Sequence, residues 1–380
     1  MFLIERLIGV SAYCLALLVT WLLLEYTTAN QRTVLRIYLV VLAVMAFLYE
    51  PYHTADLYRV NEMMEQFATY DFATFFQELV APSSVPTARV LYWIIGKTGI
   101  YGLLPALVTV ICYGCVFYIL NKTSELYYIG REHIATALLF FMATGNYMMV
   151  VSNVRTMLCF ALIAVCYFRE TVEKKFTFFH ILLYLFAVTT HTLGVVVVAL
   201  RLLCPLFNKE LPTWRRAIYP LGVLMGGMVM LLFFGKNMVT LVASVTDKFS
   251  EYMFGDAYSY FWEYAIDAVL LLLELVTLYY FRRVRTDVQR NVSNMSHLLV
   301  LCLLPAVAFC FEFSTFHRLV SMLVPLITLP VMAVATSEGA RVRFGVYRIH
   351  LRAIIQIVSL VLLVLSCARG SLCSFKFFTL

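Results

Sequence analysis

Residues 134–168 form an almost uninterrupted apolar stretch, in which Arg155 is the one charged side chain. A helix of about 20 apolar residues crosses a bilayer, so this stretch is long enough for two short crossings. The polar segment 145–155 would form the turn between them. Arg155 would then begin the second crossing at one membrane face. An arginine there is either an interfacial anchor whose charge reaches water or part of a functional site.

The composition of the whole chain is that of a membrane protein. Of its 380 residues, 62% are hydrophobic and 13% are charged, whereas soluble domains carry about 25% charged residues. The net charge of +7 is spread over short loops, so it does not indicate a nucleic-acid partner. We therefore predict an all-α polytopic membrane protein of about twelve transmembrane helices, forming a single integral domain over residues 1–380.

Polar or charged turns separate the apolar segments from one another. The segment 176–203 is long and has His191 near its middle, so we divide it there into a sixth and a seventh span. The first apolar run has no clear small-residue cleavage site and is interpreted as an uncleaved span. The other predicted spans are residues 7–24, 34–49, 100–120, 134–151, 154–168, 218–234, 265–281, 297–311, 319–336 and 353–367.

Clusters of Lys and Arg follow every odd-numbered span, which places them all on one face. The positive-inside rule makes this face cytoplasmic. Both chain ends and the two longer loops, residues 50–99 and 235–264, would then be extracytoplasmic. The regular alternation supports the division at His191, because one undivided helix would move the later clusters to the other side. The clusters include Arg32, Arg36, Lys122, Arg131, Arg169, Lys174, Lys175, Lys209, Arg215, Arg216, Arg282, Arg283, Arg341, Arg343, Arg348 and Arg352.

The first long outer loop is acidic and contains apolar residues at helical spacing. This pattern predicts a short amphipathic helix on the membrane surface. Asp56 and Arg59 are three residues apart and could form an ion pair on one face of this helix. A solvated surface helix without a functional role is the structural alternative. The apolar residues are Leu57, Val60, Met63, Met64 and Phe67.

Three predicted outer turns hold titratable side chains at one depth. Arg155 begins the fifth span, His191 lies between the sixth and seventh, and Arg318 begins the eleventh after a turn that contains Glu312 and His317. Arginine presents a planar fork of donors that suits phosphate oxygens, and histidine acts as a base or a phosphate-contacting donor. The pattern indicates a site for a lipid-linked phosphate or pyrophosphate, with an interfacial polar collar as the alternative.

The sequence contains no motif for a metal site, a nucleotide-binding loop or a serine hydrolase. There is no His, Asp or Glu cluster with metal-ligand spacing, no Walker loop and no G-x-S-x-G element. We therefore predict no metal and no cofactor. Cys112 and Cys115 have redox spacing but lie inside an apolar span, where we interpret them as small packing residues.

Four short motifs in this sequence resemble the bacterial EpsG/Wzy-type polysaccharide polymerases, and the resemblance covers most of the chain in layout. Thr192-Leu193-Gly194 departs from the run of small and polar residues that usually follows the family's histidine. The motifs are Ala55-Asp56-Leu57-Tyr58-Arg59, Ser152-Asn153-Val154-Arg155-Thr156-Met157-Leu158, Thr190-His191-Thr192 and Phe316-His317-Arg318.

The resemblance implies a metal-independent glycosyltransferase with a GT-C-like helical bundle in the bacterial inner membrane. Such enzymes join oligosaccharide repeat units carried on undecaprenyl pyrophosphate, at the outer leaflet, into an O-antigen, capsule or exopolysaccharide. A flippase and a chain-length regulator are possible partners. The growing chain leaves its lipid carrier and is transferred to a sugar hydroxyl of the next lipid-linked unit.

Roles for individual residues follow from the outer-face pattern and the resemblance together. Charge that grows on the leaving pyrophosphate would be offset by arginine side chains, and aromatic rings suit the apolar faces of sugars, although an interfacial aromatic belt is the alternative. We expect Arg155, Arg318 and Arg59 to bind pyrophosphate, with Arg59 alternatively holding Asp56. His191, Glu312 and Asp56 are rival catalytic bases, and Tyr58, His317, Tyr260 and Trp262 are expected to contact substrate.

Three other functions compete with a polymerase. A transporter or lipid-linked oligosaccharide flippase should carry ionisable residues near mid-membrane and inverted repeats. Here the charges lie mostly at span ends and no repeat is evident, but Glu274 is an acid inside an apolar span. A membrane acyltransferase could also use a lone histidine, although an arginine pair favours phosphate chemistry. An O-antigen ligase differs mainly in its acceptor.

Overall fold

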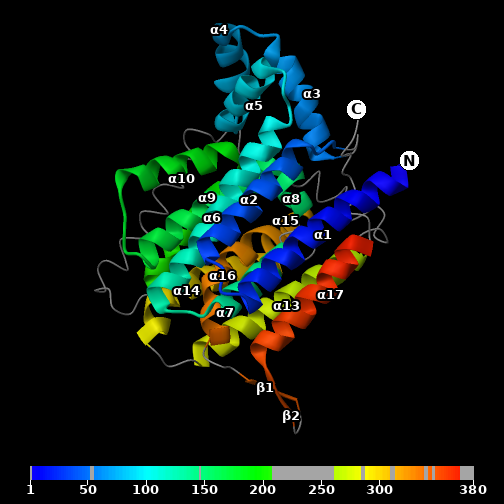
Figure 1. Ribbon diagram of the computed structural model, residues 1–380. Coiled ribbons are helices and arrows are strands. Elements are labelled where there is room, and N and C mark those ends of the chain that lie inside the picture. The colour runs from blue at the N-terminus through cyan, green and yellow to red at the C-terminus, as the bar shows by residue number, and fades with distance from the viewer. Residues whose placement is uncertain are drawn as a thin grey trace.

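The computed structural model describes residues 2–51, 55–144, 147–207, 261–283, 287–308, 313–337, 341–344 and 347–368. Within these residues nearly all regular structure is helical, and the long helices lie side by side as a bundle (Figure 1). The predicted eighth span at 218–234, residues 235–260 of the second outer loop and Glu312 lie outside the described residues.

The N-terminal half is a series of helices in which a group of short helices interrupts the long ones. The elements are α1 (Phe2–Tyr26), α2 (Gln31–Phe47), α3 (Asp56–Ala68), α4 (Phe72–Phe75), the π-helix η1 (Phe76–Val80), α5 (Pro86–Thr98), α6 (Leu103–Tyr127), α7 (Arg131–Thr144), α8 (Tyr147–Ser152), α9 (Val154–Thr171), α10 (Phe178–Thr190), α11 (Leu193–Leu203) and the 3₁₀ turn η2 (Cys204–Phe207).

The C-terminal half contains helices and one β-hairpin. The elements are α13 (Phe261–Arg283), α14 (Asp287–Ala308), α15 (Phe313–Arg318), the π-helix η3 (Leu319–Leu323), α16 (Val324–Ser337), β1 (Arg341–Phe344), β2 (Tyr347–His350) and α17 (Leu351–Ala368). The strands are antiparallel with Arg341 opposite His350. The described residues are nevertheless consistent with the predicted all-α membrane protein, and the hairpin is a short exception in which basic and apolar residues alternate with the period of a strand.

Four of the described helices are long and apolar enough to cross a membrane, and further apolar helices are shorter. The chain is therefore a multi-pass membrane protein by length and composition, while the number of twelve spans stays a prediction. The long helices include Gly9–Tyr26, Leu103–Tyr127, Glu263–Arg283 and Thr315–Ser337, and the shorter ones include Phe178–Thr190, Leu193–Leu206, Val292–Val307 and Leu351–Leu365.

The predicted division of residues 176–203 at His191 is confirmed. The backbone of His191 is extended, with φ −149° and ψ 133°, and it ends α10 before α11 begins at Leu193. An extended residue cannot continue the α-helical dihedral angles. The apolar run thus forms two short helices joined by His191 and Thr192.

The predicted polar turn at 145–155 is largely wrong, because most of it forms the buried helix α8. Tyr147 is fully buried, and its hydroxyl donates a hydrogen bond to the Leu42 carbonyl at 2.6 Å. The apolar residues of this segment gain more by packing against the bundle than by reaching the surface. The break before α9 is confined to Asn153, whose φ is −92° and ψ is 50°.

The centre of the bundle is formed by α9 and α16. Every residue from Val324 to Thr336 on α16 is buried, as are most residues of α9. A helix that is apolar on all sides belongs in a core. The helices around this centre expose apolar side chains outward, as expected for a surface in contact with lipid hydrocarbon. Examples are Leu15, Val40, Leu272 and Val364.

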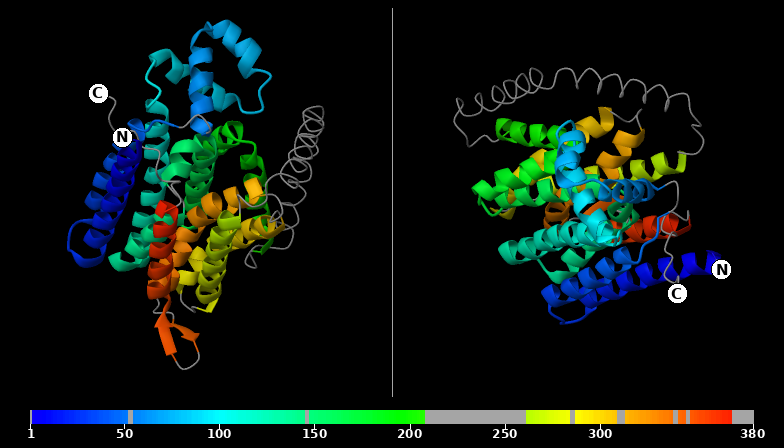
Figure 2. Two further views of the ribbon diagram at one scale, coloured as in Figure 1. Left: turned by 90° about the vertical axis from the view of Figure 1, so that its right-hand side faces the viewer. Right: turned by 90° about the horizontal axis from the view of Figure 1, so that it is seen from above.

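The helices α3, α4 and α5 project from one end of the bundle, and we call residues 56–98 the cap (Figures 1 and 2). Leu57, Val60, Met64 and Phe67 of α3 are buried, so the predicted amphipathic helix is confirmed. Its apolar face packs on α5 and not on a membrane surface, which corrects the prediction. Gly96 permits this close packing, because a Cβ there would lie 2.3 Å from the Met64 carbonyl oxygen.

The β-hairpin lies at the end of the bundle opposite the cap (Figure 1). The Arg131 guanidinium donates a hydrogen bond to the Thr27 carbonyl at 2.6 Å, and Arg32 pairs with Glu125. These contacts bring together the turns after α1 and α6. Two of the predicted basic clusters therefore share one end, as the alternation requires, and the assignment of this end to the cytoplasm stays a prediction.

Candidate functional site

Arg155 is the second residue of α9, at the end of the bundle that carries the cap. The first N–H groups of a helix have no intrahelical partner and lie at the positive end of its dipole. The side chain of the N-cap residue Asn153 makes no capping hydrogen bond to this helix. The Arg155 side chain is partly buried and has no ion-pair partner among the described residues. The start of α9 is therefore a concentration of positive charge.

His191 lies in the two-residue link between α10 and α11 and is 9% exposed. The Leu193 N–H donates a hydrogen bond to His191 Nδ1 at 3.2 Å. Since Nδ1 accepts this bond, the proton of the neutral ring is assigned to Nε2. Burial and then the positive charges of Arg318 and Arg155 lower the pKa of His191 to about 3. The imidazole is therefore neutral near pH 7 and presents Nε2–H as a donor.

The charges acting on His191 show that three separate elements converge here. Arg155 comes from α9, His191 from the α10–α11 link and Arg318 from the end of α15, and both guanidinium groups are close enough to act on the imidazole. Arg318 also has no ion-pair partner within the described part of the chain. Within the described residues, two arginines without ion-pair partners therefore lie near a neutral donor, an arrangement that suits an anion. We call Arg155, His191 and Arg318 the arginine site.

Gly194 allows the histidine link, the two residues His191 and Thr192 between α10 and α11, to pack closely against α9. A Cβ on Gly194 would lie 2.6 Å from Cys159 Sγ and 3.2 Å from the Val188 Cα. Cys159 is one helical turn after Arg155, so both lie on the same face of α9. Only a residue without a side chain lets α11 begin this close to the face that carries Arg155.

Gly194→Ala is expected to displace the histidine link and to reduce activity more than it reduces the amount of folded protein. The new methyl group would overlap Cys159 Sγ and press on the α10 backbone. Overpacking of this kind costs about 1–3 kcal/mol. The measurement is polymer length in membranes that contain equal amounts of each variant.

Gly114→Ala on α6 is the matched control, because a Cβ there would meet no atom within 4 Å. The double variant Gly194→Ala/Cys159→Ala removes the sulfur and should recover part of the lost activity. Full activity of Gly194→Ala alone would show that the position of the link does not matter.

The segment around Arg318 is fixed by an irregular turn. Leu319–Leu323 forms a π-helix in which the Val324 N–H bonds to the Leu319 carbonyl. Pro325 follows, and its ring would clash with the carbonyl four residues earlier in a regular helix. The wider turn relieves this clash, and such turns are frequent at functional sites.

The cap meets the arginine site through Tyr92 of α5. Tyr92 is 2% exposed. Burial raises its pKa, the charge of Arg155 opposes that rise and the charge of Asp56 adds to it. Arg155 and Asp56 therefore both lie within electrostatic reach of Tyr92. Asp56 also faces Arg59 at 3.9 Å, but both side chains are exposed, so this ion pair contributes little stability.

The other predicted site residues are only partly covered by the structure. Glu312 and Tyr260 fall outside the described residues, and so does the side chain of Trp262 near the start of α13. Tyr58 is a half-buried residue of α3 in the cap. His317 lies beside Arg318, and its Nδ1 is 2.8 Å from an oxygen of Asp267 on α13. Asp267, Tyr92 and Gly194 were not predicted as site residues.

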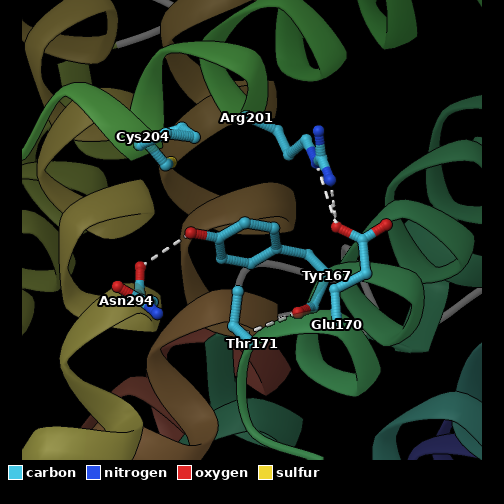
Figure 3. Close-up of a pocket in the computed structure, with 7 residues that line it drawn as sticks. Tyr167, Glu170, Thr171, Arg201, Cys204 and Asn294 are labelled. Atoms are coloured by element: carbon cyan, nitrogen blue, oxygen red, sulfur yellow. Dashed lines mark hydrogen bonds and ion pairs between the residues drawn. The ribbon is translucent and has the colours of Figure 1, made fainter. Parts of the chain in front are cut away.

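A cavity of about 150 Å³ lies at the other end of α9 (Figure 3). Arg201 Nε donates to Glu170 at 3.0 Å, the Tyr167 hydroxyl donates to the Asn294 carbonyl at 2.9 Å, and Thr171 donates to the Tyr167 carbonyl at 2.7 Å. These bonds tie α9 to α11 and α14. We interpret the cavity as part of the helix packing, since its polar groups bind mainly one another.

Within the described residues no group of three or more His, Cys, Asp or Glu side chains could hold a metal ion. The Cys112 and Cys115 thiols lie inside α6 as free cysteines. The polar chemistry of the described site is therefore that of arginine, histidine and tyrosine, with Asp56 and Asp267 as carboxylates close to it.

The family model of the EpsG family matches residues 88–370, a range that includes the whole arginine site. The chain belongs to the EpsG family. This is the Wzy-type polysaccharide polymerase family, so the resemblance noted in the sequence motifs is confirmed. No curated protein and no solved structure matches the chain. In this EpsG-family chain the matched range begins within α5, so Asp56 and Arg59 lie outside it.

Membership of the EpsG family has three general consequences. The family's role is that of a polysaccharide polymerase, with the character of a glycosyltransferase. Its substrates are lipid-linked oligosaccharides in a membrane. The apolar helices of this chain agree with a multi-pass membrane protein of that kind.

Proposed function

We propose that this EpsG-family protein joins undecaprenyl-pyrophosphate-linked oligosaccharide repeat units at the outer leaflet of the bacterial inner membrane. The observation that carries the proposal is the arginine site. Two arginines that have no carboxylate partner among the described residues act on a buried, neutral histidine. Like charges held together are costly unless an anion neutralises them. A pyrophosphate group at the membrane surface supplies that anion.

Arg155 and Arg318 bind the pyrophosphate of the donor. Each guanidinium offers a bidentate fork to phosphate oxygens. Negative charge on these oxygens grows as the bond to the sugar breaks, so fixed positive charge stabilises the transition state more than the ground state. The free N–H groups at the start of α9 add to the same positive field.

His191 acts as a third phosphate contact. Its Nδ1 already accepts the Leu193 N–H, which leaves Nε2–H as the outward donor. With a pKa of about 3 the ring would hold a transferred proton only weakly, so the role of donor suits it better than that of base. Of the two other bases predicted from the sequence, Asp56 is about half exposed on the cap, and Glu312 lies outside the described residues.

Aromatic residues of the cap, together with two residues far outside it in the sequence, supply the contacts to sugar in this proposal. Tyr58 together with Tyr260 and Trp262 presents aromatic rings to the repeat units. Arg59 binds a second phosphate or holds Asp56, its neighbour at 3.9 Å. The proposal includes a GT-C-like helical bundle and a metal-independent reaction. The partners it includes are a flippase and a chain-length regulator. The product is an O-antigen, a capsule or an exopolysaccharide.

A transporter or flippase is the second candidate, and Glu274 is the observation that favours it. Glu274 is fully buried on α13, and neither of its carboxylate oxygens has a hydrogen-bond partner among the described residues. Buried acids inside a membrane often mark proton or ion paths. An O-antigen ligase remains the nearest enzyme alternative, since the arginine site would serve it equally.

Deletion of the gene followed by gel profiling of surface polysaccharide tests these functions against one another. For a polymerase we expect a single repeat unit on its acceptor in the deletion strain, and a restored ladder with the wild-type gene or with Glu274→Gln. Repeat units that accumulate unflipped on the cytoplasmic side would instead identify a flippase. A ladder that stays on the lipid carrier would identify a ligase.

A further inference from the structure

His317 and Asp267 form an imidazole–carboxylate pair directly beside the arginine site. His317 Nδ1 lies 2.8 Å from Asp267 Oδ2, although the two residues are 50 positions apart in the chain. The side chain of Asp267 is 1% exposed, whereas that of His317 is 19% exposed. The carboxylate is therefore sealed in the bundle, and the imidazole reaches its accessible surface.

Two further contacts fix the position of this imidazole. The ring of Phe316 stacks on that of Tyr264 with centroids 5.9 Å apart, which holds α15 against α13 one turn before Asp267. The Ser321 hydroxyl donates a hydrogen bond to the His317 carbonyl at 2.5 Å. Contacts on both sides of His317 thus hold its backbone, and Asp267 orients its ring.

The pair sets the tautomer of His317. A carboxylate only accepts hydrogen bonds, so Nδ1 carries the proton and Nε2 carries the lone pair. A carboxylate against Nδ1 therefore leaves Nε2 as the basic nitrogen of this ring. The environment of His191 is the opposite, because two guanidinium groups act on that ring. Two histidines of one site in opposite electrostatic environments are suited to different roles.

His317 and Arg318 place a basic nitrogen and a pyrophosphate-binding group in one short segment. The two residues are consecutive, and consecutive side chains on a helix diverge by about 100°. His317 faces Asp267 on α13, while Arg318 acts on His191 in the α10–α11 link. The turn at the end of α15 therefore places a basic nitrogen next to a group that binds the leaving pyrophosphate.

We propose that His317 is the general base of the transfer reaction and that Asp267 is the residue that positions it. The proposal rests on the proposed polymerase function. The acceptor hydroxyl oxygen forms a bond to the anomeric carbon of the donor, and its proton passes to His317 Nε2. The bond between that carbon and the pyrophosphate oxygen breaks, and its electron pair leaves with the undecaprenyl pyrophosphate held by the arginines. The proton on His317 is then released to water.

The test uses the full-length protein reconstituted in lipid nanodiscs, with a synthetic undecaprenyl-pyrophosphate oligosaccharide repeat unit as the probe. His317→Ala should lower kcat about 100-fold or more, while the KM for the probe stays within about threefold, because the arginine site is intact. Added imidazole should raise the kcat of His317→Ala about tenfold or more, since it replaces the missing base. Imidazole should restore no activity in Arg318→Ala, which loses a phosphate contact.

Asp267→Asn is the second variant, and it keeps the shape of the side chain and a hydrogen-bond partner for the ring. We expect its kcat to fall at least tenfold with KM nearly unchanged, because an amide, which donates as well as accepts hydrogen bonds, does not fix Nε2 as the basic nitrogen. Unchanged kcat in His317→Ala, or a His317→Ala variant that binds the probe but gains nothing from imidazole, would overturn the proposal. If the wild type itself makes no polymer from the probe, the proposed function fails, and that result is distinct from an active His317→Ala.

Discussion

Arg155→Lys should lose most polymer formation, about 100-fold in kcat, while the protein accumulates in the membrane at the wild-type level. A lysine keeps the charge but offers a single ammonium in place of a planar fork, so it cannot hold two phosphate oxygens at once. Loss of one preorganised donor to a developing negative charge typically costs about 10²–10³ in rate. The measurement is chain length and rate with the synthetic lipid-linked repeat unit.

Arg36→Lys is the matched control for this change. Arg36 is an exposed arginine on α2, which begins at the end of the bundle opposite the cap, and its replacement should leave the rate unchanged. Arg318→Lys should behave like Arg155→Lys if both side chains bind the same pyrophosphate. A near-normal ladder from Arg155→Lys would remove the arginine site from the mechanism and leave the family relationship intact.

Glu25→Ala is expected to destabilise the bundle strongly, although Glu25 lies far from the arginine site. Glu25 pairs with Arg352, which joins the end of α1 to the start of α17, and only 7% of the Glu25 side chain is exposed. Thr136 on α7 accepts a hydrogen bond from Gln356 at 3.0 Å, next to this pair. Removal of one partner leaves a largely buried charge, at a cost of about 2–4 kcal/mol. The measurement is the apparent Tm of the detergent-solubilised protein.

Glu125→Ala provides the comparison, because Glu125 pairs with Arg32 at the surface, where 59% of the arginine side chain is exposed. Exposed pairs contribute about 0–1 kcal/mol, so the Tm should barely change. The double variant Glu25→Ala/Arg352→Met should recover stability relative to Glu25→Ala, since no unpaired charge remains. Equal shifts in Tm for Glu25→Ala and Glu125→Ala would contradict a difference based on burial.

The sequence predicted those features that depend on local pattern. Apolar runs and their polar breaks located the start of α9 at Arg155 and the division at His191, because helix length and the cost of an exposed apolar residue are local properties. Prediction failed where packing partners decide the outcome. The apolar face of α3 had no partner in the sequence, so it was assigned to the membrane surface, whereas α5 covers it. Likewise α8 is buried because α6 and α9 pack against it, and its Tyr147 hydroxyl reaches the Leu42 carbonyl of α2.

The residues of the site divide in the same way. Arg155, His191 and Arg318 could be predicted because each lies in a short polar break between apolar runs, and charged residues there are costly unless they have a role. Asp267 could not be paired with His317, because the two are 50 positions apart and no local pattern links them. Its position inside an apolar span was a signal that it is buried, but not of what it contacts.

The amino-acid sequence by itself determined that this protein is a multi-pass helical membrane protein and which side chains stand at the ends of its helices. Both follow from transfer free energies that each segment carries independently. Only the tertiary structure decided that Arg155 and Arg318 share one histidine and that a carboxylate backs His317. It also decided that a missing side chain at Gly194 lets the link approach α9. These are contacts between distant segments, and their energies exist only once the helices have packed.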